Sequence, residues 1–178
     1  EYSNVNNSTL MLRRKDAIKD LAFWLVIIWL MVVPGFTITG IFFHQIHLSE
    51  LKNIPLWFWS TNYVWYAIAS ISGAFFSGLL VDKYSAHKIA SVTQLPMLFA
   101  CFLLWFGNGK ISLALFFIFF GLAGGMLQPM VNSLLAERYG TKWLGEIKSL
   151  IWALSVFSSA LSPIIMGLMI DTGSGLTE

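Results

Sequence analysis

The chain has 178 residues, of which 57% are hydrophobic and only 11% carry a charge, and its formal net charge is +2 at pH 7. About a quarter of the residues in an ordinary soluble domain are charged, so this composition excludes a typical soluble globular protein. The small excess of basic residues gives no support to nucleic-acid binding.

Five long apolar runs contain no Lys, Arg, Asp or Glu and account for most of the chain. They cover residues 21–49, 53–81, 89–109, 111–136 and 149–170. A helix needs roughly 20 apolar residues to cross about 30 Å of hydrocarbon, and each run is long enough. Buried soluble helices rarely stay apolar for so long, and strands of a transmembrane barrel are shorter and alternate polar with apolar residues. The sequence therefore predicts an all-α fold, a polytopic transmembrane helix bundle over residues 21–171. We expect its five spans at about 21–44, 62–81, 89–107, 111–136 and 148–170.

The stretch before the first run, residues 1–20, opens with a polar segment rich in Asn and Ser. It begins with Glu rather than Met and lacks the apolar core of a secretory signal. We therefore expect this stretch to be a loop cut from a longer chain.

Basic residues gather on one side of the predicted bundle. Nine of them precede the first run or lie in the second and fourth links: Arg13, Arg14, Lys15, Lys19, Lys83, Lys88, Arg138, Lys142 and Lys148. The other side has Lys52 and Lys110. Because Lys and Arg are retained on the cytoplasmic side during insertion, we expect a cytoplasmic N-terminus and an external tail at 172–178. The bundle itself is expected in the cell (inner) membrane.

Short loops and small residues indicate close packing of the helices. Residues 108–110 join the third and fourth runs, which must then be antiparallel neighbours. Small residues also recur four apart within three runs: Ser70, Ala74 and Gly78; Gly121 and Gly125; Ser155 and Ser159. Membrane helices associate through such close backbone approach, so we expect these residues at helix contacts.

The link between the second and third runs carries the most specific motif of the chain, GLLVDKYSAHK from Gly78 to Lys88. A Gly at the end of a helix lets a neighbouring backbone approach. Asp82 can accept hydrogen bonds at the positive N-terminus of another helix, and the basic residues can pair with acidic groups or lipid headgroups. The motif therefore predicts a latch between helices at the membrane surface.

This string resembles the G-x-x-x-D-[RK]-x-G-[RK]-[RK] loop signature of the major facilitator superfamily of secondary transporters. Gly78, Asp82 and Lys83 match, and Lys88 supplies a basic residue one position beyond the end of the pattern, whereas Ser85 and Ala86 stand where the family usually has Gly and a basic residue. These departures are similar to the second, weaker copy of the signature, between helices eight and nine of twelve. The resemblance implies that the five runs are helices seven to eleven. It also implies that residues 1–20 belong to the cytoplasmic loop between two six-helix halves.

The same resemblance implies alternating access, in which two halves rock about a central site and expose it to each side in turn. A gating role is implied for the loop and for the end of the fourth run: Gly78, Asp82, Lys83, Lys88, Glu137 and Arg138. The helix that Asp82 would cap is expected in the missing N-terminal half.

Substrate residues are expected in the first and fourth runs, which as helices seven and ten would line the cavity. The candidates are polar or aromatic residues within these runs: Trp29, Phe36, Thr37, Gln128 and Asn132. Polar side chains inside a membrane usually face protein or water, so helix packing is the alternative role for each.

The spans carry no ionisable acid or base near their centres, so a coupling proton or ion is expected to use the missing helices. The chain has no HExxH motif, no acid within a span and one cysteine, so we expect no catalytic residue, metal or cofactor, and not an enzyme. The expected partners are the lipid bilayer and a small-molecule substrate. We expect the substrate to be a small organic anion or a drug-like solute, with small neutral solutes as a further alternative. A non-transporting multi-span membrane subunit or scaffold is the alternative function.

Overall fold

The computed structural model describes residues 14–172, except for the side chain of Asp16. Most of the predicted N-terminal loop and external tail, residues 1–13 and 173–178, therefore lies outside the described residues. Between residues 14 and 172 the chain forms helices and no strand, which confirms the predicted all-α fold.

The first crossing of the bundle is built from consecutive helical segments. After a single turn, α1 (Arg14–Ala17), come α2 (Leu21–Ile27), the π-helix η1 (Ile28–Val32) and α3 (Val33–Phe43). Asp20 caps α2, since its carboxylate accepts a hydrogen bond of 3.0 Å from the Ala22 N–H. Pro34, at the start of α3, has no N–H and cannot bond to the residue four positions earlier. The wider π-turn immediately before it is consistent with that interruption.

The remaining helices complete the antiparallel crossings and the turns between them. They comprise α4 (Gln45–Leu51), α5 (Leu56–Thr61), α6 (Tyr63–Tyr84), α7 (Ala86–Ile89), α8 (Leu95–Phe106), α9 (Lys110–Tyr139) and α10 (Leu144–Asp171). Within residues 14–172, four stretches are long and apolar enough to cross a membrane: Leu21–Phe43, Leu56–Tyr84, Lys110–Tyr139 and Leu144–Asp171.

The third predicted span differs from the expectation of one helix at 89–107. The chain forms the short helix α7, then a turn, and only then α8, which has 12 residues. At 1.5 Å per residue α8 is about 18 Å long, too short to cross a bilayer alone. Pro96 in the first turn of α8 lacks the N–H needed to continue a helix from α7. This crossing is therefore a broken segment rather than a single long helix.

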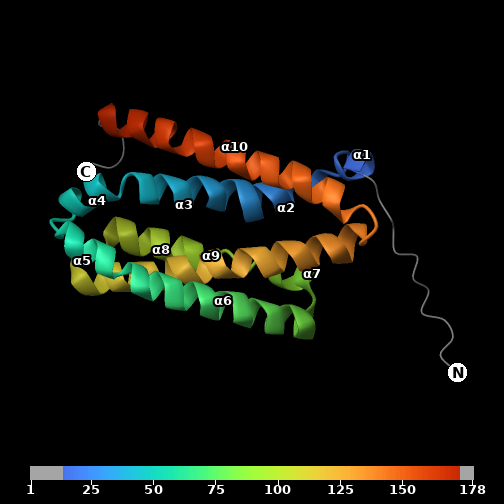
Figure 1. Ribbon diagram of the computed structural model, residues 1–178, viewed down its shortest axis with the longest axis horizontal. Coiled ribbons are helices and arrows are strands. Elements are labelled where there is room, and N and C mark those ends of the chain that lie inside the picture. The colour runs from blue at the N-terminus through green and yellow to red at the C-terminus, as the bar shows by residue number, and fades with distance from the viewer. Residues whose placement is uncertain (1–13, 173–178) are drawn as a thin grey trace, which may run out of the picture.

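The helices form two layers, as Figure 1 shows. One layer contains α10 packed on α3, and the other contains α9 with α6 and α8 packed against it. Loops gather at two opposite ends of the bundle, which we name the Asp20 end and the Lys52 end after one residue in each. Successive crossings run in alternate directions between these ends, as the predicted five-span order requires.

Small residues hold α6 and α9 together at backbone distance. A Cβ atom at Gly121 would overlap the Tyr66 carbonyl oxygen, and one at Gly125 would overlap the Ser70 carbonyl oxygen. The predicted packing role of Gly121 and Gly125 is confirmed. Gly78 behaves differently, because a Cβ there would meet nothing within 4 Å in the described part of the chain. The close approach predicted at Gly78 is therefore not made by residues 14–172.

Serines of α10 fasten it to the first crossing. The Ser158 hydroxyl donates to the Val32 carbonyl at 2.8 Å, and the Ser162 hydroxyl donates to the Phe36 carbonyl at 2.5 Å. Ser155 makes a longer bond of 3.4 Å to the Met31 carbonyl. These bonds tie the π-helix and the start of α3 to one face of α10.

Candidate functional site

A hollow of about 330 Å³ lies between the two layers, near the middle of the bundle. Its walls come from η1, α3 and α10 on one side and from α6 and α9 on the other. Gly35, Gly124 and Ser70 are among its lining residues, and their small size leaves space between the backbones. Its volume is within the usual range for small-molecule sites.

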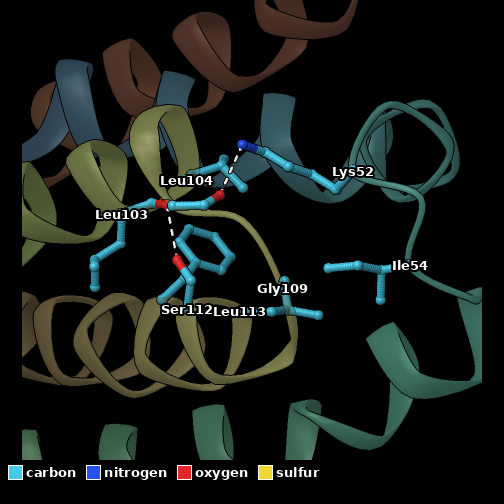
Figure 2. Close-up of a pocket in the computed structure, with 9 residues that line it drawn as sticks. Lys52, Ile54, Leu103, Leu104, Gly109, Ser112 and Leu113 are labelled. Atoms are coloured by element: carbon cyan, nitrogen blue, oxygen red, sulfur yellow. Dashed lines mark hydrogen bonds between the residues drawn. The ribbon is translucent and has the colours of Figure 1, made fainter.

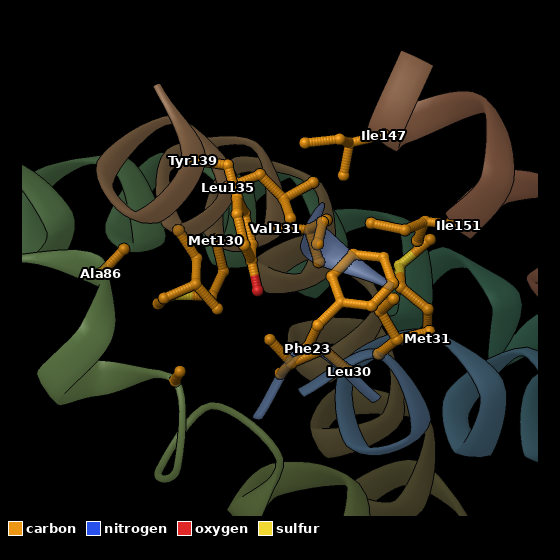
Figure 3. Packing of buried hydrophobic residues seen from close by; sticks show 14 residues of the cluster. Phe23, Leu30, Met31, Ala86, Met130, Val131, Leu135, Tyr139, Ile147 and Ile151 are labelled. Carbon is orange, nitrogen blue, oxygen red and sulfur yellow. The ribbon is translucent and has the colours of Figure 1, made fainter. Parts of the chain in front are cut away.

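Contacts at the Asp20 end join the two layers on one side of this hollow. Arg138, near the end of α9, donates to the carboxylate of Asp20 at 2.8 Å, and the Tyr139 hydroxyl donates to the same oxygen at 3.2 Å. The Arg138 hydrogen bond lowers the pKa of Asp20, so this carboxyl is ionised at neutral pH. Buried side chains from both layers pack beside the ion pair, and Phe23 meets the Tyr139 ring edge-on at 5.7 Å (Figure 3).

Aromatic rings join the two layers toward the Lys52 end. Phe42 of α3 inserts among three rings of the other layer, with centroid distances of 5.5 Å to Tyr63, 5.4 Å to Tyr66 and 5.5 Å to Phe120. Edge-on pairs of this kind are favourable beyond the area that they bury. Phe42 thus joins the two layers on the opposite side of the hollow from Asp20.

Lys52 reinforces the same end by binding the exposed end of α8. Its ammonium donates to the Gly107 carbonyl oxygen at 2.9 Å (Figure 2). It also donates to the Trp105 carbonyl oxygen at 3.2 Å. These carbonyls end a helix and have no partner within it, so a cation is favourable there. Partial burial lowers the pKa of Lys52 from its ordinary value.

The polar groups of the hollow are uncharged. Gln128, Tyr66, Thr39 and Ser70 contribute an amide and three hydroxyls, and none of them makes a side-chain hydrogen bond within the described residues. Trp152 adds a large ring that is 43% exposed. Among residues 14–172 no group of three or more His, Cys, Asp or Glu could hold a metal ion. The arrangement can bind a small solute through hydrogen bonds and ring contacts.

Comparison with known proteins identifies the family. The model of the Major Facilitator Superfamily matches residues 5–174, nearly the whole chain. This chain belongs to the major facilitator superfamily. No curated protein and no solved structure matches it. The superfamily consists of transporters and not of enzymes. Family membership and the long apolar helices together make the protein a multi-pass integral membrane protein.

The five predicted substrate residues of this superfamily member have different surroundings. Gln128 lines the hollow. Trp29, Phe36, Thr37 and Asn132 are not among the residues that line it. The Thr37 hydroxyl donates to the Val33 carbonyl of its own helix at 2.9 Å, and Asn132 is exposed one turn beyond Gln128.

Sequence reasoning missed the lining residues outside its two chosen helices. Tyr66 and Ser70 come from α6, whereas Trp152, Ser155 and Ser159 come from α10. In the sequence, the four-residue spacing of Ser70 with Ala74 and of Ser155 with Ser159 predicts helix packing. That spacing also places Tyr66 on the same helical face as Ser70, so the same signal could have located this wall.

The residues for which a gating role was predicted divide into two groups. Glu137 accepts hydrogen bonds from the N–H groups of Ala86 at 2.8 Å and His87 at 3.3 Å and from the Ser85 hydroxyl at 3.0 Å. This carboxylate therefore caps α7, the kind of contact that the sequence predicted for Asp82. Asp82 itself is exposed and makes no hydrogen bond or ion pair within residues 14–172.

The basic residues of the signature are also exposed. The Lys83 ammonium lies 5.0 Å from the centre of the Tyr84 ring, and Lys88 points away from the core. Together with Gly78 and Asp82, they form a polar surface on α6 and α7 at the Asp20 end. We name Gly78, Asp82, Lys83 and Lys88 the loop surface.

Proposed function

We propose that the protein is a secondary active transporter that moves a small solute across the membrane by alternating access. The observation that carries this proposal is the hollow between the two layers, bordered at both ends by contacts that join them. Family membership supports transport as the general activity. The fastened ends suit a half-transporter that moves as one body, because rocking requires each half to keep its shape.

A second six-helix half would supply the opposite wall of the site. The loop surface favours this arrangement, because the Asp82 carboxylate is exposed and has no partner among the described residues, and a carboxylate can cap the N-terminus of a helix. We infer that this surface meets the other half on the cytoplasmic side and holds that side closed. Basic residues gather at the Asp20 end, so we place this end on the cytoplasmic side of the inner (cell) membrane.

Coupling to a proton or ion would then depend on the other half. The residues around the hollow include no carboxylate, amine, guanidinium or imidazole. A group that binds and releases a proton near neutral pH is therefore not provided by this wall.

Cysteine labelling of the full-length protein in proteoliposomes tests alternating access. Ser159 lines the hollow and its replacement by cysteine, with Cys101→Ser to remove the native thiol, places one thiol there. We expect a membrane-impermeant thiol reagent to reach this cysteine from either face. Phe157→Cys is the control, because Phe157 is exposed on α10 and does not line the hollow. Labelling of Ser159→Cys from one face alone would favour the subunit or scaffold alternative.

A further inference from the structure

The uncharged lining of the hollow carries information about its ligand. We propose that this wall binds an uncharged, hydroxyl-rich ring solute, held by hydrogen bonds to Gln128 and Tyr66 and by contact with the Trp152 ring. The inference rests on the proposed transport function and specifies its substrate class.

The hydrogen-bonding groups of the wall match hydroxyl groups in kind. The Tyr66, Thr39 and Ser70 hydroxyls each donate and accept, and the Gln128 amide does both through separate atoms. None of the four side chains makes a hydrogen bond to another described residue. A ligand hydroxyl also donates and accepts, so it can pair with any of these groups without leaving a buried polar atom unpaired.

The rings favour a flat apolar face on the solute. Tyr66 comes from α6 and Trp152 from α10, so aromatic side chains contribute to the wall from both layers. The C–H face of a saturated ring can lie against such a side chain while its hydroxyls point to the polar groups. Aromatic residues combine a large contact area with few rotatable bonds, which lowers the entropic cost of binding.

Charged solutes are disfavoured by the same wall. An organic anion would need a basic partner and a cationic drug an acidic one, and the lining residues include neither. Once the second half shields the site from water, an unpaired charge becomes costly, whereas a hydroxyl needs only a hydrogen bond. Of the solutes left open by the sequence, neutral ones therefore fit this wall best.

Three ring solutes that differ in charge test the proposal. Uptake of labelled glucose, glucosamine and glucuronate is measured with the full-length protein in proteoliposomes at about pH 6, where the amine is protonated. We expect uptake of glucose to exceed that of both charged probes. Trp152→Ala should reduce glucose uptake more than Trp152→Phe, which keeps an aromatic ring.

Exchange of an amide for an acid gives the sharper test. Gln128→Glu should raise the ratio of glucosamine to glucose uptake by about tenfold, the factor that corresponds to about 1.4 kcal/mol. Asn53→Asp makes the corresponding amide-to-acid change at an exposed position in the turn after α4, outside the hollow, and should leave the ratio unchanged.

The outcomes separate this inference from the transport function. Preferred uptake of a charged probe, uptake of none of the three, or an equal shift in both acid variants would overturn the substrate class. Transport itself would stand or fall separately, with the labelling of Ser159→Cys from the two faces.

Discussion

Arg138 and Asp20 lie 118 residues apart in the sequence, and the Arg138 guanidinium approaches the Asp20 carboxylate to 2.8 Å. The contact joins the end of α9 to the cap of α2 and therefore connects the two layers. Asp20 has two tasks there, since one oxygen accepts from Arg138 and the other accepts from the Ala22 N–H.

Substitution of Asp20 should separate these two tasks. Asp20→Asn removes the charge and keeps an oxygen that can cap α2, whereas Asp20→Ala removes both. Both partners are about one-third exposed, at 33% and 34%, so the ion pair alone contributes little. We expect Asp20→Ala to lower the unfolding temperature in detergent clearly more than Asp20→Asn. Equal losses would show that the charge, and not the cap, is the larger contribution.

The pH dependence of the ion pair follows from the lowered pKa of Asp20. A carboxyl whose pKa is lower in the folded protein stabilises the fold above its ordinary pKa of 3.8. That contribution is lost as the pH falls through the lowered value. The stability that Asp20 contributes should therefore be fully present and constant between pH 5 and pH 8. The gap between wild type and Asp20→Asn should close only below about pH 3.8.

Glu137 should protect the first turn of α7. Glu137→Ala leaves two N–H groups and one hydroxyl without their acceptor, which costs about 1 kcal/mol for a helix cap. We expect amide hydrogen exchange in α7 to become about fivefold faster. Glu146→Ala, an exposed acid in the first turn of α10, is the control and should leave α7 unchanged. Unchanged exchange in Glu137→Ala would contradict the capping role.

Asp82 should affect transport without affecting the fold. The side chain is exposed and has no partner within residues 14–172, so Asp82→Asn should leave expression and unfolding temperature intact. If it holds the cytoplasmic side closed, transport by the full-length protein should slow. Unchanged transport kinetics would remove Asp82 from the gating group.

Gly125 should tolerate no side chain. Gly125→Ala places a Cβ on the Ser70 carbonyl oxygen, so α6 and α9 must separate, at a cost of about 1–3 kcal/mol. Gly78→Ala adds the same atom where nothing lies within 4 Å and should not destabilise this half. Thermal unfolding of both variants in detergent measures the difference. A Gly125→Ala variant as stable as wild type would show that the two backbones are less closely packed.

Ser158 should stabilise the contact of α10 with the π-helix. Its hydroxyl donates to the Val32 carbonyl in the other helix, and Ser158→Ala should cost about 0.6 kcal/mol, the average for such bonds in membranes. The Ser149 hydroxyl bonds to the Glu146 carbonyl of its own helix, so Ser149→Ala should cost less. A double mutant with Gly35→Ala, next to Ser155, would test whether the α3–α10 contact acts as a unit.

The sequence by itself determined the class of the protein. Runs without charged residues, such as 111–136, can satisfy their backbone groups in a bilayer only as helices, so membrane helices follow from composition. The close packing at Gly121 and Gly125 was also predictable, because small residues four apart lie on one helical face. The loop signature from Gly78 to Lys88 indicated the superfamily, because its spacing is specific.

Only the tertiary structure decided which residues share a site. The hollow brings Tyr66 and Trp152 to the same space as Gln128, although 24 residues separate Gln128 from the nearer of the two. The break before α8 and the choice of Glu137 as a cap also depend on neighbours that are distant in sequence. Hydropathy and spacing describe one helix at a time. The partners of a side chain depend on how two helices cross, and that crossing is set by packing over the whole bundle.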